Sequence, residues 1–369
     1  MSMTPLSVES VQAALRNVPD PIYGKPMLEL GLLSEISVRE GVVSLQVTMH
    51  AVSEAKQRQL VTELERLLVA AGATRVDVRF RIEAPMRRTN ADDPVPTARN
   101  VVLVMSGKGG VGKSTCAANL ALALHRAGAR VGLLDADIYG PSVPTMLGVS
   151  GHPRSTDGKK IEPLERFGMK LMSIGFLIES NKDAIIWRGP MVQGALNQFL
   201  ADVSWGELDY LVLDLPPGTG DVALSLAQRL KSTGAVIVTT PQEIALQDVY
   251  KSVSMCKKLN IPILGVIENM SYFVDPSGAR HAIFGEGGGQ KIAEFAEAPL
   301  LGQIPLDPQV RQWGDDGTPI VHAAPAHPSA QAFGALAEAL STRIARDAFE
   351  RAGEKAPDTE GPRRLKILR

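Results

Sequence analysis

The strongest constraint on the fold is a series of short segments that are apolar throughout. They read VVLVM (101–105), RVGLLD (130–135), LDYLVLD (208–214), AVIVTT (235–240) and PILGVIENM (262–270). Such segments are buried on both faces, as in a parallel sheet covered by helices on both sides. Helical patterns lie between them, which predicts an α/β fold with a mostly parallel sheet. A short strand at 300–307 and a helix from about 329 to 346 complete this region.

The first ninety residues follow another pattern. Ser7 and Ser53 are suitable N-caps for two helices, and residues 43–49 and 75–81 alternate between apolar and polar side chains. This order predicts a small α/β domain over residues 1–82, with a helix, two strands, a helix and a strand. Residues 83–98 contain three prolines and no apolar period, which predicts a linker. The larger domain is expected over residues 99–348 and a disordered tail over 349–369.

Charge and composition exclude several classes of function. Lysine and arginine number 39 against 40 aspartates and glutamates, so no global basic field attracts nucleic acid or an anionic membrane. The N-terminus lacks the pattern of a secretory signal, and no apolar run is long enough to span a bilayer. Only two cysteines, Cys116 and Cys256, are present. These features predict a cytoplasmic protein that binds neither nucleic acid nor a membrane.

A phosphate-binding motif follows the first apolar strand of the larger domain. The sequence GKGGVGKST fits G-x-x-x-x-G-K-[ST] in the required strand–loop–helix context. The candidate nucleotide-binding residues are Gly107, Lys108, Gly109, Gly110, Val111, Gly112, Lys113, Ser114 and Thr115. The glycines let backbone amides converge on phosphate oxygens. We expect Lys113 to reach the β- and γ-phosphates of ATP and the Ser114 hydroxyl to bind Mg²⁺.

Lys108 gives this motif a second lysine. A lysine flanked by glycines is ordinarily a solvated surface charge. However, GKGGVGKST resembles the deviant Walker A sequence of the MinD, ParA and nitrogenase iron-protein class. The resemblance implies that Lys108 crosses a dimer interface and acts on the phosphates of the partner subunit.

Three aspartates follow apolar strands. Asp135 and Asp137 end the second strand of the larger domain, and Asp214 ends a later one before Pro216-Pro217-Gly218. The carboxyl ends of parallel strands form the ligand crevice in such sheets. Asp214 is therefore the candidate Mg²⁺ ligand, and residues 216–218 are a candidate switch loop. Asp137 is the candidate to position the attacking water, although aspartates at strand ends also serve as caps.

These features together resemble one family, the Mrp (ApbC-like) P-loop ATPases that carry iron–sulfur clusters. The matching stretches are SGKGGVGKST, LLDADIYGPS, WRGPM, WGELDYLVLDLPPGTGD, TTPQEIALQDV, ENMSYF, IFGEGGG and GQIPLDPQVR. The small N-terminal domain resembles the metal–sulfur-cluster assembly domain found ahead of such ATPases. The resemblance implies a homodimer that hydrolyses ATP, carries a cluster between its subunits and delivers it to apoproteins. It also implies that Asn269 recognises adenine, although an asparagine at a strand end can simply turn the chain.

The chain departs from this family at the cluster ligands. Typical members carry a CxxC pair just after ENMSYF, whereas this segment reads VDPSGARH, with Asp275 where the first cysteine is expected. Cys116 and Cys256 lie in helical patterns and are expected to be small core or helix-face residues. Asp275 and His281 are potential ligands for a harder metal, but two such residues often occur together by chance. The cluster is thus implied by resemblance, while its usual ligands are absent.

Two other functions remain open. A MinD/ParA-like positioning ATPase would bind a membrane or DNA, and the C-terminal RRLKILR alternates basic and apolar residues. A nucleotide-gated scaffold would dock client proteins through the small domain and hold no metal.

Overall fold

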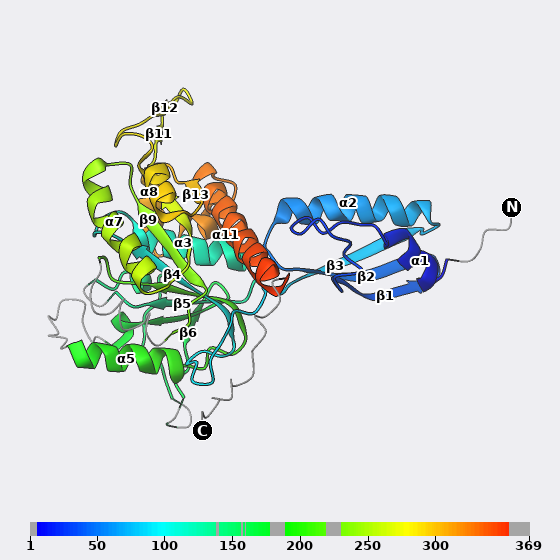
Figure 1. The fold of residues 1–369 in the computed structure, drawn as a ribbon, viewed down its shortest axis with the longest axis horizontal. Coiled ribbons are helices and arrows are strands. Elements are labelled where there is room, and N and C mark those ends of the chain that lie inside the picture. The colour runs from blue at the N-terminus through cyan, green and yellow to red at the C-terminus, as the bar shows by residue number, and fades with distance from the viewer. Residues whose placement is uncertain are drawn as a thin grey trace, which may run out of the picture.

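The computed structural model describes residues 6–137, 140–155, 158, 160–177, 189–218 and 230–353. Within these residues, a small N-terminal unit and a larger unit are joined by an irregular segment (Figure 1). The N-terminal unit consists of α1 (Val8–Leu15), β1 (Leu33–Arg39), β2 (Val42–Met49), α2 (Glu54–Ala70) and β3 (Arg75–Ile82). The predicted order of helix, two strands, helix and strand is confirmed.

Local sequence explains the N-terminal unit. Ser7 and Ser53 cap α1 and α2, and each accepts a hydrogen bond from a backbone amide in the first turn. In β2, every second residue is buried, so one face packs against the helices. β1 and β2 pair antiparallel through a tight turn, whereas α2 crosses over between β2 and β3, which pair parallel.

The larger unit contains an eight-stranded sheet in the order β13-β10-β9-β4-β8-β5-β7-β6. Its strands are β4 (Ala98–Ser106), β5 (Val131–Asp135), β6 (Leu164–Arg166), β7 (Met169–Ser173), β8 (Leu208–Asp214), β9 (Gly234–Thr239), β10 (Ile263–Glu268) and β13 (Leu300–Gln303). All neighbours pair parallel except β6 and β7. A separate hairpin joins β11 (Phe273–Val274) and β12 (Arg280–His281). The predicted α/β fold with a mostly parallel sheet is confirmed.

Helices cover both faces of the large sheet. They are α3 (Lys113–Arg126), α4 (Val143–Met146), η1 (Ile174–Leu177, a 3₁₀ turn), α5 (Gly189–Ala201), α7 (Glu243–Lys258), α8 (Gly288–Ala296), α9 (Pro308–Asp315), α10 (Ile320–Ala323) and α11 (Pro328–Gly353). In β4, Val102 and Val104 pack with the helices α3 and α11, while Leu103 and Met105 pack with α5, α7 and α8. No helix in the described part of the chain is long and apolar enough to cross a membrane.

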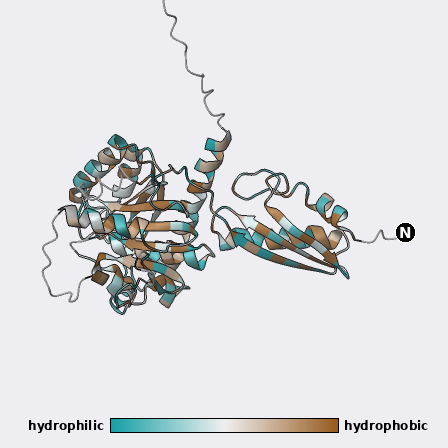
Figure 2. Ribbon diagram, turned by 90° about the horizontal axis from the view of Figure 1, so that it is seen from below, coloured by the Kyte–Doolittle hydropathy of each residue, from teal (hydrophilic) through white to brown (hydrophobic). Residues whose placement is uncertain are grey.

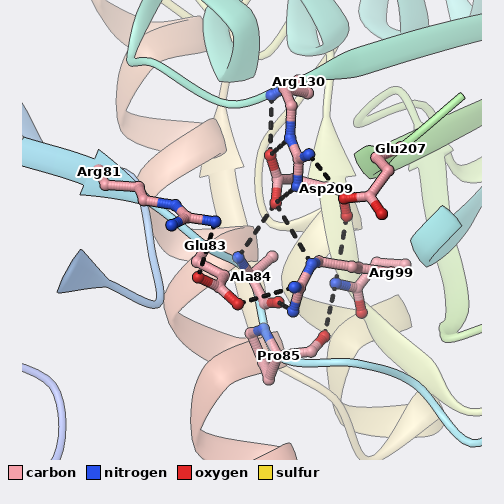
Figure 3. A network of polar contacts seen from close by, with 9 residues as sticks. Arg81, Glu83, Ala84, Pro85, Arg99, Arg130, Glu207 and Asp209 are labelled. Carbon is pink, nitrogen blue, oxygen red and sulfur yellow. Dashed lines mark hydrogen bonds and ion pairs between the residues drawn. The ribbon is translucent and has the colours of Figure 1, made fainter. Parts of the chain in front are cut away.

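A buried carboxylate anchors the N-terminal unit to the larger unit (Figure 3). Asp209 is fully buried at the start of β8, where it accepts hydrogen bonds from the backbone amide of Ala84 (3.3 Å) and from Arg130 Nε (3.0 Å). Arg99 binds Glu83 at 2.7 Å and donates to the Ala84 carbonyl at 3.1 Å. These contacts lie at the amino ends of the strands, so the N-terminal unit is docked at that edge of the sheet.

The segment over residues 83–98 differs from the predicted spacer. It forms no helix or strand before β4, but its Arg87 side chain is buried and forms an ion pair with Asp93. The same guanidinium donates to the carbonyls of Val95, Ala98 and Lys231. Proline and charge content predicted a linker, but the long-range partners of Arg87 hold the segment in place. At the other end of the chain, α11 extends to Gly353, and the rest of the predicted tail lies outside the described residues.

We expect Asp209→Ala to loosen the N-terminal unit. The substitution leaves the buried Ala84 amide without its acceptor, which costs about 1–3 kcal/mol, and it removes the partner of the half-exposed Arg130 guanidinium. Urea unfolding should show this loss, and limited proteolysis should show faster cleavage between residues 83 and 98. The control is Glu207→Ala, because the exposed Glu207–Arg130 pair is worth less than about 1 kcal/mol. Equal effects of the two substitutions would contradict the anchoring role.

Candidate functional site

The glycine-rich loop lies at the carboxyl end of the central strand β4 and leads directly into α3. Glycine is required in this loop because a side chain would clash with neighbouring residues and because part of the backbone has a positive φ. A Cβ at Gly107 would lie 2.3 Å from the backbone nitrogen of Val249. Gly112 has a φ of +80°, and a Cβ there would lie 2.2 Å from Asn269 Nδ2. The loop can therefore pass between α7 and the end of β10 only with glycine at these positions.

Lys113 contacts two of the predicted acidic residues. Its Nζ lies 2.7 Å from Asp214 Oδ1 and 3.4 Å from Asp137 Oδ2, and it donates to Ser114 Oγ at 3.2 Å. The lysine is only 6% exposed and Asp214 is fully buried. Three residues predicted from separate motifs thus meet at one point, as expected for the carboxyl edge of a parallel sheet.

Two oxygens at this point have no partner among the described residues. Asp214 Oδ2 and Asp137 Oδ1 are both buried without a hydrogen bond. Burial raises the pKa of Asp214, which Lys113 partly offsets. Together with the Ser114 hydroxyl, these carboxylates form a set of hard oxygen donors of the kind that Mg²⁺ prefers. The residues present therefore fit the predicted Mg²⁺ site.

Asp135 supports the site from behind. Its carboxylate accepts hydrogen bonds from the backbone amides of Asp137 and Val143 (both 3.2 Å) and from Ser173 Oγ (3.0 Å). Burial, together with the nearby charge of Asp214, raises the pKa of Asp135 to about 7. Asp135 thus fixes the chain that carries Asp137 instead of facing the loop itself.

Lys108 lies within the glycine-rich loop, and the candidate switch loop begins beside it. Lys108 is half-buried, and its ammonium makes no ion pair or hydrogen bond with the residues that the structure describes. The backbone amide of Gly218, at the end of Pro216-Pro217-Gly218, donates to the Ser106 carbonyl at 2.8 Å. The start of the switch segment is therefore bonded to the strand that precedes the loop. Residues 219–229 and the first two residues of WRGPM lie outside the described residues.

Asn269 has a contact that its predicted role did not include. Its Nδ2 donates to the Val111 carbonyl at 2.9 Å, and its backbone amide donates to Thr239 at 2.8 Å. Its side chain also lines a cavity of about 530 Å³ beside the glycine-rich loop. Other residues of the lining are Thr115, Met146, Phe273, Pro305 and Leu306. The cavity is large enough for a planar base, and its lining is mainly apolar.

Glu268 is a further residue of this region that sequence reasoning missed. It is fully buried, and its carboxylate accepts hydrogen bonds from Gln303 Nε2 (2.7 Å), Ser271 Oγ and the backbone amide of Gly289. A Cβ at Gly289 would lie 2.7 Å from Glu268 Cβ, which accounts for the last glycine of IFGEGGG. Glu268 thereby joins β10, β13, α8 and the base of the hairpin.

The hairpin β11–β12 stands where the family resemblance places its cysteines. Asp275 Oδ1 accepts hydrogen bonds from Ser277 Oγ (2.6 Å) and from the amides of Ser277 and Ala279, and its Oδ2 contacts His281 Nε2 at 2.7 Å. These bonds lower the pKa of Asp275. The carboxylate therefore closes the turn. Among the described residues, no three His, Cys, Asp or Glu side chains gather into a potential metal site.

Both cysteines are buried in helices, away from the hairpin. Cys116 lies in α3, and Cys256 lies in α7 with its sulfur 3.7 Å from Met105. Burial raises the pKa of the Cys116 thiol to about 12 and that of Cys256 to about 11. Both sulfurs are out of contact with solvent, so neither residue is accessible as a cluster ligand in this fold. The prediction that both are small core or helix-face residues is confirmed.

The chain is similar to known proteins along most of its length. Residues 97–341 match the ParA family, described as NUBPL iron-transfer P-loop NTPase, and residues 9–80 match a family described as iron-sulfur cluster assembly protein. The iron-sulfur cluster carrier protein of Deinococcus radiodurans is 44% identical over 352 residues, or 95% of this chain and 99% of that protein. The carrier protein of Aquifex aeolicus is 54% identical over 252 residues, or 67% of this chain and 68% of that protein.

A solved structure is similar to the larger unit. It is that of a nucleotide-binding protein from Archaeoglobus fulgidus in complex with ADP, in which cobalt was found. The two chains are 40% identical with a TM-score of 0.54, over 62% of this chain and 92% of the other.

We expect neither thiol to react in the native chain. At pH 8, both groups are protonated and out of contact with solvent, so Ellman's reagent should detect no fast-reacting thiol. After unfolding in guanidinium chloride, the same sample should give two thiols per chain. A thiol that reacts within seconds in the native chain would show that one cysteine is available as a ligand.

Proposed function

The chain belongs to the family of iron-sulfur cluster carrier proteins built on an iron-transfer P-loop NTPase domain, and from this we propose how it works. It binds and hydrolyses Mg²⁺-ATP, and as a homodimer it carries iron–sulfur clusters to apoproteins. The observation that carries the proposal is the meeting of Lys113, Asp214 and Asp137 at the end of the glycine-rich loop. We place the protein in the cytoplasm, where its two free cysteines stay reduced.

In the proposed mechanism, the loop and α3 bind the phosphates. Backbone amides of residues 107–115 and the N-terminus of α3 face the phosphate oxygens, and Lys113 exchanges its contact with Asp214 for the β- and γ-phosphates. Ser114 and Asp214 would hold Mg²⁺, which neutralises charge on the phosphate oxygens. Asp137, whose Oδ1 has no partner among the described residues, orients the attacking water and accepts its proton.

Two further residues complete the nucleotide site. Asn269 and the cavity that it lines receive the adenine base, and the hydrogen bond from Asn269 to Val111 holds the loop against this cavity. Lys108 acts on the phosphates of the partner subunit in the homodimer. The lack of any partner for its ammonium in the described part of its own chain supports this role.

A second candidate is a nucleotide-gated scaffold that docks client proteins without a cluster. Two observations favour it. The carboxylate of Asp275 accepts the hydrogen bonds that close the hairpin turn, and both cysteines are buried in other elements, α3 and α7. The two candidates share the nucleotide site and differ in whether iron and sulfide are held.

Two lysine substitutions test the nucleotide site. Lys113→Ala should abolish ATP binding, because a buried charge-assisted contact to phosphate is worth roughly 2–5 kcal/mol. Lys108→Ala should retain ATP binding, measured by calorimetry, while hydrolysis falls at least about tenfold. A mixture of the two variants should regain part of the activity, because some sites then receive Lys108 from one chain and Lys113 from the other. Wild-type affinity in Lys113→Ala, or wild-type turnover in Lys108→Ala, would contradict the assigned roles.

Cluster retention separates the carrier from the scaffold. If the protein is a carrier, we expect the desalted wild type to retain a small, substoichiometric amount of iron and sulfide after anaerobic reconstitution, because Asp275 offers a hard oxygen where iron prefers thiolate. Iron and sulfide no higher than in an unreconstituted sample would favour the scaffold. The double variant Asp275→Cys, Ser277→Cys should retain more, since it restores two thiolates per hairpin. A stoichiometric [4Fe–4S] cluster in the desalted wild type would show that other ligands exist.

A further inference from the structure

One face of the N-terminal sheet is uncovered. In Figure 1, α2 lies above β1–β3, and Figure 2 looks onto the sheet from the opposite side. The strand register shows which residues share the uncovered face. They are Ser34, Ser37 and Arg39 of β1, Val42, Ser44, Gln46 and Thr48 of β2, and Arg75, Asp77, Arg79 and Arg81 of β3. We call this set the open face. Its only apolar residue is Val42.

The open face is strongly basic although the chain as a whole is not. It carries four arginines against one aspartate, whereas the whole chain has a net charge of −1. Arg75 pairs with Asp77 at 2.8 Å, and Arg81 pairs with Glu83 at 3.3 Å. Arg39 and Arg79 are exposed and make no ion pair or hydrogen bond with the residues that the structure describes. Two guanidinium groups on opposite strands are thus available to an outside partner.

We propose that the open face docks an acidic, extended segment of a partner protein. Such a partner is a client protein that receives the cluster. The docking proposal rests on the proposed function only for this identification of the partner. Arginine is suited to this task because its planar guanidinium binds a carboxylate through two parallel hydrogen bonds.

The spacing of the charges selects an extended partner. Residues at alternate positions of a strand lie about 6.6 Å apart, so an extended acidic segment that crosses the open face can place one carboxylate at Arg79 of β3 and another at Arg39 of β1. The serine, threonine and glutamine side chains between the arginines supply hydrogen bonds to such a segment. With little apolar surface, the contact is weakened by salt and dissociates readily, which suits a client that must leave.

The chemistry of the face favours a protein over a nucleic acid. Proteins that bind single strands without sequence preference stack bases on aromatic side chains, and the open face has none. The anchor at Asp209 also holds the face away from the glycine-rich loop, because the anchor lies at the amino edge of the large sheet and the loop at its carboxyl edge. A docked partner therefore leaves the nucleotide site accessible.

The test is a binding measurement on the full chain with matched charge variants. The probe is a fluorescein-labelled peptide of about 20 residues that alternates glutamate and threonine, and anisotropy gives its Kd at low and at moderate salt. The test variant is Arg39→Glu, Arg79→Glu. The control is Arg16→Glu, Arg88→Glu, which changes the charge equally at exposed arginines outside the open face. None of these four side chains makes a hydrogen bond or ion pair with the described residues, so the fold should survive, which urea unfolding verifies.

We expect the Kd of the test variant to rise at least about tenfold and that of the control to change less than about twofold. Binding by the wild type should also weaken with added salt. Unchanged binding in the test variant would overturn the proposal. A lysine–threonine peptide that binds as well as the acidic one would also overturn the proposal. The arginines would then serve only to keep the edge strands from pairing with other chains. Tighter binding of an oligodeoxythymidylate through the same arginines would overturn it in favour of nucleic acid.

The proposed function can fail separately. Peptide binding is measured without nucleotide or cluster, so its outcome does not depend on ATP hydrolysis or on iron content. Conversely, the test variant should hydrolyse ATP at the wild-type rate, because neither arginine lies near the glycine-rich loop.

Discussion

The buried ammonium of Lys113 constrains the architecture of the larger unit. A buried charge without a partner costs several kcal/mol, so Lys113 requires carboxylates at the point where the loop turns into α3. The parallel register provides them. Asp214 pairs with Val104 in the central strand on one side and with Asp135 on the other, so β5 and β8 end at the same level, two residues before the end of β4. The site depends on this register, because a shift of β5 or β8 by two residues would move the carboxylate of Asp135 or Asp214 by about 6.6 Å.

Local sequence patterns predict two kinds of element: helices whose first turn is capped by a nearby side chain, and strands that consist of a continuous apolar run. The caps Ser7 and Ser53 and the strands around 101–105 and 208–214 are of this kind. The strands β6 and β7 were not predicted, because neither has a long apolar run and their turn places Phe167 at a φ of +53°. The hairpin β11–β12 was missed for a related reason: its strands have two residues each, and the Asp275 side chain holds the turn.

In the nucleotide site, too, some residues could be predicted from local sequence and others depend on long-range contacts. The motif and the strand-end aspartates could be predicted, because the chemistry of phosphate and Mg²⁺ restricts which residues can serve. The contact between Asn269 and Val111 spans 158 positions, and no local pattern encodes it. Arg87 is a second residue whose contacts no local pattern encodes. Its segment reads as a spacer, yet Asp93 and three backbone carbonyls, one of them at Lys231, account for its burial.

The two edges of the large sheet carry different tasks, and α3 joins them. The helix begins at Lys113 beside the phosphate loop and ends at Arg126, about 21 Å away at 1.5 Å per residue. Just beyond its end, Gly128 lies so close to Ile82 of the N-terminal unit that a Cβ would approach it to 3.3 Å. The residues from Cys116 to Leu124 are buried throughout, so the helix cannot bend without disturbing the core that both units share. One continuous buried helix therefore connects the phosphate-binding edge of the large sheet to the N-terminal unit.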